Sequence, residues 1–243
     1  MDLGKTGFGD RINRLLTQNA DKAGESLNTY ARRAIITRLV SELERESSPE
    51  VAAVLADARS FEAENIELTD PDTYLPGQSS GPTHLLIDDV DRVAAARATG
   101  MLGSPRDEQF DKLARMTLRA MGAQGASISF VDDRTQFVKA SVGTTGTAAQ
   151  PQTVAVERSA CRLVVETGET LVAPDIRDSA LLRDHADATT SDLIAYMGAP
   201  IKTEAGFTVG VLDVWDYRPR KWTAGHVKTL EDIAWLVRER IRR

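Results

Sequence analysis

The feature that most constrains the fold is a pair of short segments in which apolar and polar residues alternate. They span residues 126–131 and 136–142, and Asp132, Asp133 and Arg134 lie between them. Alternation with a period of two is typical of strands, and aspartate is common in tight turns. The sequence therefore predicts a β-hairpin with antiparallel strands.

A second predicted hairpin and several predicted helices complete the pattern. This hairpin joins residues 196–201 to residues 208–215 through a turn at 204–206. The helical spacing of apolar residues predicts helices over 90–99, 108–121, 159–167 and 224–241. A short strand is expected at 171–173. Helices, then a meandering antiparallel sheet, then a closing helix predict an α+β fold.

The first 46 residues predict a separate region of two short helices. Asp10 is a candidate N-cap of the first helix, Gly24 ends it, and Ser26 caps the second. Each helix has one apolar stripe, but a segment of under about 50 residues buries too little surface to be stable alone. We therefore interpret residues 1–46 as a helical dimerisation module and expect a homodimer.

Residues 47–87 read as a connector between two regions. Ser48 and Pro49 mark a helix start, because a hydroxyl cap followed by proline suits the first helical turn. Residues 69–82 are dense in turn and breaker residues. They predict a flexible acidic linker, and the alternative is an ordered loop on the surface.

Composition favours a cytoplasmic protein. The chain has one cysteine, Cys161, which cannot form an internal disulfide and suits a reducing compartment. We find no secretory signal and no apolar run of about 18 residues, so no membrane partner is expected. The net charge is -6, and residues 1–46 contribute +1 to it, leaving -7 on the remainder. Any nucleic-acid surface must therefore be local.

Three segments in order carry a family pattern. Residues 92–105 lead to Phe110 and Asp111, residues 168–175 follow, and the strongest segment runs from Tyr196 to Thr223. That last segment includes Tyr-Met-Gly-Ala-Pro-Ile and Val-Gly-Val-Leu-Asp-Val. The order and spacing resemble the GAF domain family over residues 88–243, a family of sensory domains.

The GAF resemblance implies a six-stranded antiparallel sheet with helices on one face and a ligand pocket on the other. By position, it implies a pocket lined by Phe130, Phe137, Cys161, Asp175, Tyr196, Met197 and Asp213. For the apolar members the alternative is ordinary core packing. Asp213 interrupts an apolar strand, and a buried acid requires a donor or a cation. It therefore either contacts a ligand or makes a structural hydrogen bond.

Cys161 lies where many family members carry cysteine. In bilin-binding relatives a histidine follows that cysteine, whereas Arg162 follows here, so a bilin is not expected. Redox turnover in the free methionine sulfoxide reductase branch uses several cysteines, and this chain has one. In place of the cyclic-nucleotide signature stands Tyr217-Arg218. Cys161 is either a pocket residue or a small apolar side chain on a packed helix.

The N-terminal helix pair has a resemblance of its own. Residues 24–30 are similar to the turn and second helix of ribbon-helix-helix DNA-binding proteins, whose dimers insert a two-stranded ribbon into the major groove. Residues 3–9, where the ribbon would lie, are short and glycine-rich. Lys5, Arg11 and Arg14 are the candidates for contacting phosphates. The module either binds DNA or only dimerises.

The sequence carries no pattern typical of catalysis. Its three histidines, at 84, 185 and 226, lie far apart, and no nucleophile elbow occurs. We therefore expect no catalytic residue, no metal and no cofactor. The predicted function is a cytosolic signal sensor that couples small-molecule binding to DNA or to a protein partner. The alternative is an interaction or scaffold protein with a vestigial pocket and no DNA binding.

Overall fold

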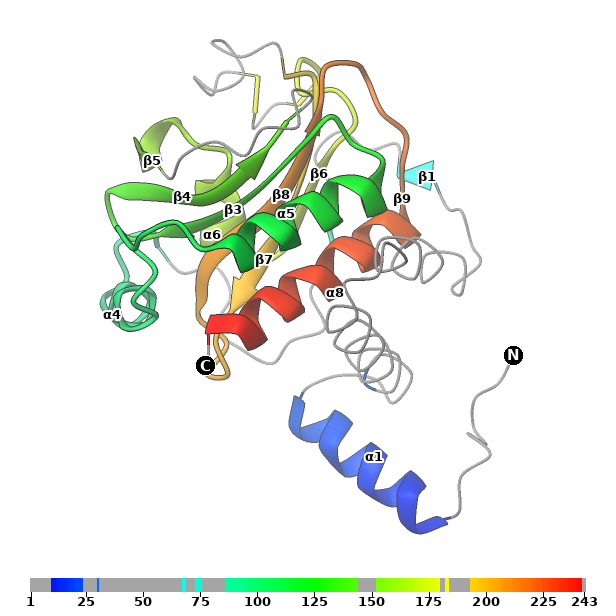
Figure 1. Ribbon diagram of the computed structural model, residues 1–243. Coiled ribbons are helices and arrows are strands. Elements are labelled where there is room, and N and C mark those ends of the chain that lie inside the picture. The colour runs from blue at the N-terminus through cyan, green and yellow to red at the C-terminus, as the bar shows by residue number, and fades with distance from the viewer. Residues whose placement is uncertain are drawn as a thin grey trace.

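The computed structural model describes residues 10–23, 30, 67–68, 73–75, 86–143, 152–179, 182–183 and 193–241 (Figure 1). Its centre is a seven-stranded sheet in which every neighbouring pair is antiparallel. The strand order is β2 (Thr73–Leu75), β6 (Thr170–Ala173), β7 (Ala195–Lys202), β8 (Thr208–Asp216), β3 (Gly125–Val131), β4 (Thr135–Val142) and β5 (Gln152–Ala155). The predicted α+β class and antiparallel sheet are confirmed.

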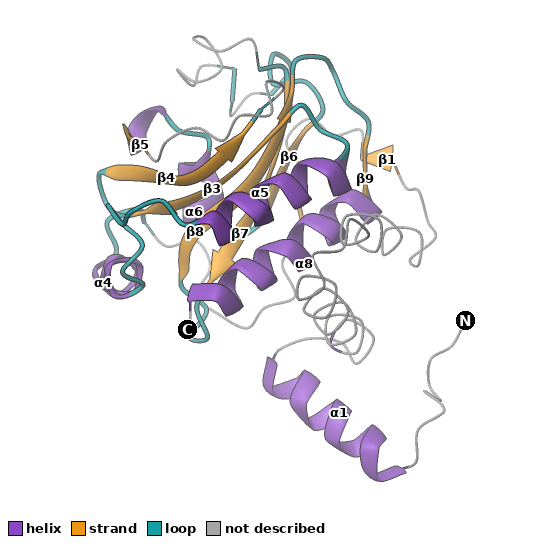
Figure 2. Cartoon of the chain, viewed as in Figure 1, coloured by secondary structure: helices purple, strands orange, loops and turns teal. Residues whose placement is uncertain are grey.

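Two helices lie side by side across one face of the sheet, as Figure 2 shows. They are α5 (Glu108–Met121) and α8 (Ala224–Ile241). Asp107 caps α5 by accepting a hydrogen bond from the Gln109 amide, and Gly122 ends it with a φ of 55°. Only glycine adopts such a positive φ without strain, so the helix stops there.

The core under these helices is continuous and apolar. It joins the inner faces of α5 and α8 to alternate residues of β3, β7 and β8. Phe110 of α5 meets Phe130 of β3 edge to face, with ring centroids 6.0 Å apart. Trp222, in β9 (Trp222–Thr223), is fully buried, and its indole nitrogen donates to the Ala173 carbonyl at 3.2 Å.

A second, smaller core covers the opposite face of the sheet. There the 3-10 turn Val156–Arg158 and helix α6 (Cys161–Thr167) pack against β3, β7 and β8. Because both faces are covered, β3 is buried at every one of its positions. The two faces of the sheet therefore have separate environments, and the site lies on the α6 side.

A β-bulge in β4 changes which side chains point to each face. Ile128 pairs with Ala140, whereas its neighbour Ser129 pairs with Val138, so Lys139 has no partner across the ladder. The Lys139 ammonium lies on the α5 side, where it donates to the Ser104 hydroxyl at 2.7 Å and to the Pro105 carbonyl. The extra residue bends β4 locally. As a result, Lys139 and its neighbour Ala140 both lie on the α5 side of the sheet.

Helix α4 (Val90–Ala98) is fixed to the end of the sheet by a buried arginine. Arg92 has no exposed surface, and its guanidinium donates to the carbonyls of Val131 at 2.9 Å, Thr208 at 3.3 Å and Ile87. Val131 ends β3 and Thr208 begins β8, so one side chain joins the same end of two neighbouring strands. Burial lowers the pKa of this guanidinium, an effect that nearby carboxylates oppose.

Two outcomes concern the N-terminal regions. The predicted first helix is confirmed as α1 (Asp10–Ala23), whereas most of the second lies outside the described residues. Within the expected linker, Thr73–Leu75 forms strand β2 against β6, so this part of the linker prediction is wrong. Just before it, β1 (Glu67–Leu68) pairs with β9. The rest of the predicted linker lies outside the described residues.

Two further points concern the edge strand β5 and the length of the helices. Strand β5, which begins at Gln152, pairs with β4 at the edge of the sheet. In the part of the chain that the structure describes, every helix is too short or too polar to cross a bilayer.

Candidate functional site

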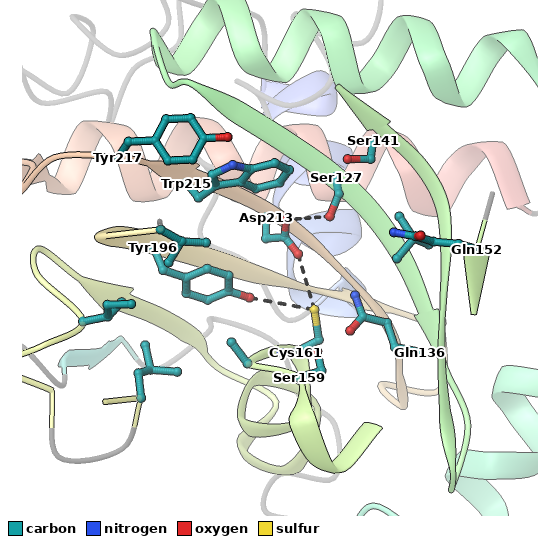
Figure 3. Close-up of a pocket in the computed structure, with 15 residues that line it drawn as sticks. Ser127, Gln136, Ser141, Gln152, Ser159, Cys161, Tyr196, Asp213, Trp215 and Tyr217 are labelled. Carbon is teal, nitrogen blue, oxygen red and sulfur yellow. Dashed lines mark hydrogen bonds between the residues drawn. The ribbon is translucent and has the colours of Figure 1, made fainter. Parts of the chain in front are cut away.

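A cavity of about 370 Å³ lies between α6 and the sheet, on the face opposite α5 and α8 (Figure 3). That volume is at the lower end of the range for small-molecule sites. Apolar side chains from the residue just before α6 and from the segment between β6 and β7 form one wall: Ala160, Ile176, Leu182 and Leu193. The strands, and Tyr217 just after β8, contribute mainly polar and aromatic side chains: Ser127, Gln136, Ser141, Gln152, Tyr196, Asp213, Trp215 and Tyr217.

Asp213 is at the centre of a hydrogen-bonded group in this cavity. It is 4% exposed, and its two carboxylate oxygens accept from different donors. The Ser127 hydroxyl donates to one oxygen at 2.7 Å, and the Cys161 thiol donates to the other at 3.3 Å. Register explains the first contact, since Ser127 and Asp213 are direct partners across β3 and β8.

Cys161 joins this group from the first turn of α6. Its amide donates to the Ser159 hydroxyl at 3.0 Å, and its sulfur lies 3.9 Å from the Tyr196 hydroxyl. Burial, together with the neighbouring Asp213 carboxylate, raises the pKa of the Cys161 thiol well above its ordinary value. The thiol therefore stays protonated at neutral pH and acts as a hydrogen-bond donor, since the nucleophile would be the thiolate.

Two glycines allow aromatic rings to lie against the sheet. A Cβ atom at Gly125 would meet the Trp215 indole at 2.0 Å, and one at Gly198 would meet the Tyr196 hydroxyl at 2.5 Å. Real side chains do not approach so closely, so any larger residue would displace these rings. The position of both rings, and with it the depth of the cavity, depends on the missing side chains.

Gln136 brings a buried amide to the same cavity. The residue is 7% exposed, and its nitrogen donates to the Ser129 hydroxyl at 2.8 Å. Its carbonyl oxygen is buried and accepts no hydrogen bond from the residues that the structure describes. Such a group is costly unless something satisfies it, so it marks a point where an incoming donor would be stabilised.

The structure brings together three of the residues predicted from the family pattern. Cys161, Tyr196 and Asp213 all line the cavity, and they contact one another. Their role in binding a ligand stays a prediction.

The placement of the three apolar candidates in the pocket is wrong. Phe130 and Met197 belong to the core under α5 and α8. Phe137 is the direct partner of Phe130 across the hairpin, so it shares that face. Side chains alternate between faces along a strand, and these three have the opposite parity from Ser127, Gln136 and Tyr196.

Asp175 is next in sequence to a cavity residue but does not line the cavity itself. Its carboxylate accepts from the Arg177 guanidinium at 2.8 Å, and this contact lowers the pKa of Asp175. The next residue, Ile176, lines the cavity instead.

Sequence reasoning missed most of the polar lining. Ser127, Gln136, Ser141 and Gln152 come from the first hairpin and its neighbouring strand, and Trp215 follows the acid in β8. A signal existed, because the polar members of an alternating strand share one face with the acid. The family pattern instead predicts the apolar members, Phe130, Phe137 and Met197, as pocket residues.

The proposed DNA-contacting residues lie elsewhere. Arg14 is on α1 with an exposed side chain, and Arg11 belongs to the same helix. Lys5 lies outside the described residues. DNA contact by these residues stays a prediction. Among the described residues, no group of three or more histidine, cysteine or acidic side chains is arranged to hold a metal.

Comparison with known families identifies the class of protein to which this fold and pocket belong. Residues 105–241 match the family model of the GAF domain, which covers more than half of the chain. The chain belongs to the GAF domain family, whose members sense small molecules or other signals. Comparison with curated protein sequences gives no match.

Several solved structures have a similar fold. The GAF domain of an Acinetobacter phosphoenolpyruvate-protein phosphotransferase is 15% identical, with a TM-score of 0.49, over 63% of this chain and 94% of that one. Free methionine-R-sulfoxide reductase from Neisseria meningitidis is 18% identical, with a TM-score of 0.46, over 66% and 96% of the two chains. A GAF domain from Coxiella burnetii is 16% identical, with a TM-score of 0.45, over 62% and 92%.

Proposed function

We propose that this protein is a cytosolic signal sensor whose GAF domain binds a small molecule in the cavity beside α6. The observation that carries the proposal is the buried group of Asp213, Ser127 and Cys161 on the wall of that cavity. A carboxylate 4% exposed has lost most of its hydration, so polar groups around it are stabilising only when well matched. A ligand whose polar groups match this lining should therefore bind the cavity in preference to water.

A sensor is favoured over an enzyme by the chemistry of Cys161. Thiol-dependent redox turnover needs a thiolate, and the raised pKa of Cys161 keeps the proton on sulfur. Turnover by the methionine sulfoxide reductase branch uses several cysteines, whereas this sequence contains one. The neutral thiol suits a role as a hydrogen-bond donor within a binding site.

The output of the sensor is proposed to pass through the N-terminal module. We expect residues 1–46 to hold two copies of the chain together and to act on DNA or on a protein partner. Helix α4 lies between that module and β3 in sequence, and Arg92 fixes it to β3 and β8. Asp213 is on β8, so α4 and the cavity are both connected to the same strand.

The substitution Asp213→Asn tests whether this carboxylate contacts the ligand. If the ligand supplies a donor to Asp213, the variant should retain its fold and lose affinity, since an amide oxygen is a weaker acceptor than a carboxylate. Thermal melts of wild type and variant against a metabolite panel, with native mass spectrometry of the purified protein, measure both effects.

A variant that melts lower than wild type and keeps the same ligand shifts would assign Asp213 a purely structural role. A wild-type protein that retains no small molecule and responds to none of the panel would favour the scaffold alternative.

A further inference from the structure

We propose that Gln136 determines which ligands the cavity binds, and that the cavity is selective for a flat aromatic compound with one N–H or O–H donor, such as an indole or a phenol. This inference rests on the proposed function as a small-molecule sensor, and it names the chemical class of the ligand and the residue that recognises it. Two features of the lining carry it: a buried carbonyl oxygen that no described residue satisfies, and aromatic rings beside an aliphatic wall.

The first feature is the fixed orientation of the Gln136 amide. The side chain comes from β4, is 7% exposed and lines the cavity on the α6 side of the sheet (Figure 3). Its nitrogen donates to the hydroxyl of Ser129 at 2.8 Å, and Ser129 itself has no exposed surface. Since this buried contact holds the nitrogen, the group that the amide offers to a ligand is its carbonyl oxygen, which is an acceptor only.

The carbonyl oxygen of Gln136 is buried and accepts no hydrogen bond from the residues that the structure describes. Ser127 also lines the cavity, but its hydroxyl donates to Asp213. A buried carbonyl without a donor is costly, because it has lost its hydrogen bonds to water.

A ligand donor changes this balance in a way that an isosteric ligand without a donor does not. An N–H or O–H that contacts the Gln136 oxygen removes the cost of the unpaired carbonyl. A ligand that places an acceptor or a methyl group there leaves the oxygen unsatisfied, and an acceptor also repels it. The cavity therefore distinguishes ligands of the same shape by the presence of a donor.

The second feature is the shape and polarity of the space beside this amide. The rings of Tyr196 and Trp215 line the cavity in Figure 3, and each ring covers a glycine of the sheet. The side chains of Ile176, Leu182 and Leu193 form the apolar wall. A flat ring system between aromatic and aliphatic surfaces buries both of its faces against apolar atoms, and its edge can direct a donor at the amide oxygen. A flat aromatic compound with one donor therefore matches both features.

Four uncharged probes test the donor preference on the full chain. Indole and 3-methylindole have a ring N–H, whereas 1-methylindole and benzofuran share the flat bicyclic body and lack the donor. We expect the two N–H compounds to bind about five- to tenfold more tightly, as one neutral hydrogen bond would give. The methylindoles are isomers, so their comparison holds size constant, and hydrophobicity alone would favour the isomer without the N–H. Calorimetric titration measures the affinities, and thermal melts confirm the folded state.

The substitution Gln136→Met tests whether this amide recognises the donor. Methionine has a side chain of similar length and only a weak acceptor, so the N–H compounds should lose their advantage and the two methylindoles should bind with nearly equal affinity. Gln152→Met is the matched control, because Gln152 also lines the cavity but is exposed on the edge strand β5. This control should keep the wild-type preference.

Equal or tighter binding of 1-methylindole and benzofuran to wild type would overturn the donor inference and leave the sensor function standing. A preference for N–H compounds that persists in Gln136→Met would also overturn it, since another group would recognise the donor. If Gln136→Met does not fold, Gln136→Asn, which keeps the amide on a shorter side chain, takes its place and should show the same loss of preference. If compounds of the metabolite panel bind and none of the four probes does, the ligand class alone fails. If neither set binds, the proposed sensor function fails with it.

Discussion

Cys161 shows how one buried side chain makes folding stability depend on pH. The pKa of its thiol is raised in the folded protein by burial and by Asp213, whereas the unfolded chain has an ordinary thiol. The protonated thiol is therefore favoured by folding. Its contribution to the free energy of unfolding is fully present below the unfolded pKa, about 8.5, and declines as pH rises toward the folded pKa.

The variant Cys161→Ala should remove this pH dependence. Between wild type and variant, the difference in free energy of unfolding should be constant up to about pH 8.5 and then fall by about 1.4 kcal/mol per pH unit in the disfavour of wild type. Urea unfolding of both proteins at several pH values measures this difference. Parallel stability curves above pH 9 would mean that the folded thiol ionises as readily as the unfolded one.

For single residues, the sequence identifies a side chain that is unusual for its position more reliably than it identifies the face of the sheet to which a side chain points. Asp213 was recognisable because an acid stands out in an apolar strand, and Tyr196 and Cys161 because the family pattern fixes their positions. Phe130 was misplaced because both faces of β3 are buried, so apolar character does not say which face a residue takes. Gln136 and Ser127 are at strand positions that alternate with the apolar core positions, so they point to the other face of the sheet. Only the pairing of the strands places both residues around one cavity.

Among the elements, α4 is attached to the sheet by the buried side chain of Arg92 together with apolar contacts of Ala96. Replacing Arg92 by alanine would leave the carbonyls of Val131 and Thr208 buried without their donor and would open a cavity. We expect Arg92→Ala to lower the free energy of unfolding by about 2–4 kcal/mol, the range typical of a broken buried network.

Arg97→Ala, in the same helix, is the matched control. Arg97 is 61% exposed and pairs with Asp133 at the surface at 2.8 Å, so its loss should cost less than about 1 kcal/mol. Urea denaturation midpoints of the two variants measure the contrast. Similar small effects of both substitutions would show that α4 is held chiefly by its apolar contacts.

The elements themselves were largely predictable where periodicity was strong. The helices α5 and α8 and the two hairpins follow from the spacing of apolar residues, because each buries one continuous stripe or face, and α1 shows the same helical spacing. The edge strands β2 and β5 were not predicted. They are three and four residues long, so they have too few positions to show alternation, and the strand beside each one determines that it is extended.

For the whole molecule, assembly is the first property to test. Deletion of residues 1–46 should weaken or abolish the dimer, because two short amphipathic helices need a partner to cover their apolar stripes. Sedimentation velocity of the full chain and the truncated chain measures the change. An unchanged dimer would move the interface away from the N-terminal module, and the closing helix α8 would become the candidate.

DNA binding is the second property, and its salt dependence is diagnostic. If the N-terminal module contacts phosphates, affinity should fall steeply with salt, and the double variant Arg11→Ala and Arg14→Ala should reduce that slope by roughly one unit for each lost contact. Binding to genomic fragments over a salt series measures the slope. No binding even near about 50 mM salt would favour a protein partner as the target of the sensor.

The position of Arg92 also has a consequence for the order in which the chain folds. Two of its three acceptors lie 39 and 116 residues further along the sequence, on strands whose ends come together only when the two strands are paired. We predict that the contacts of Arg92 form late in folding, so that loss of the side chain accelerates unfolding and leaves the folding rate nearly unchanged. Helix α4, which follows the N-terminal regions in sequence, would then be the last part to dock and the first to leave.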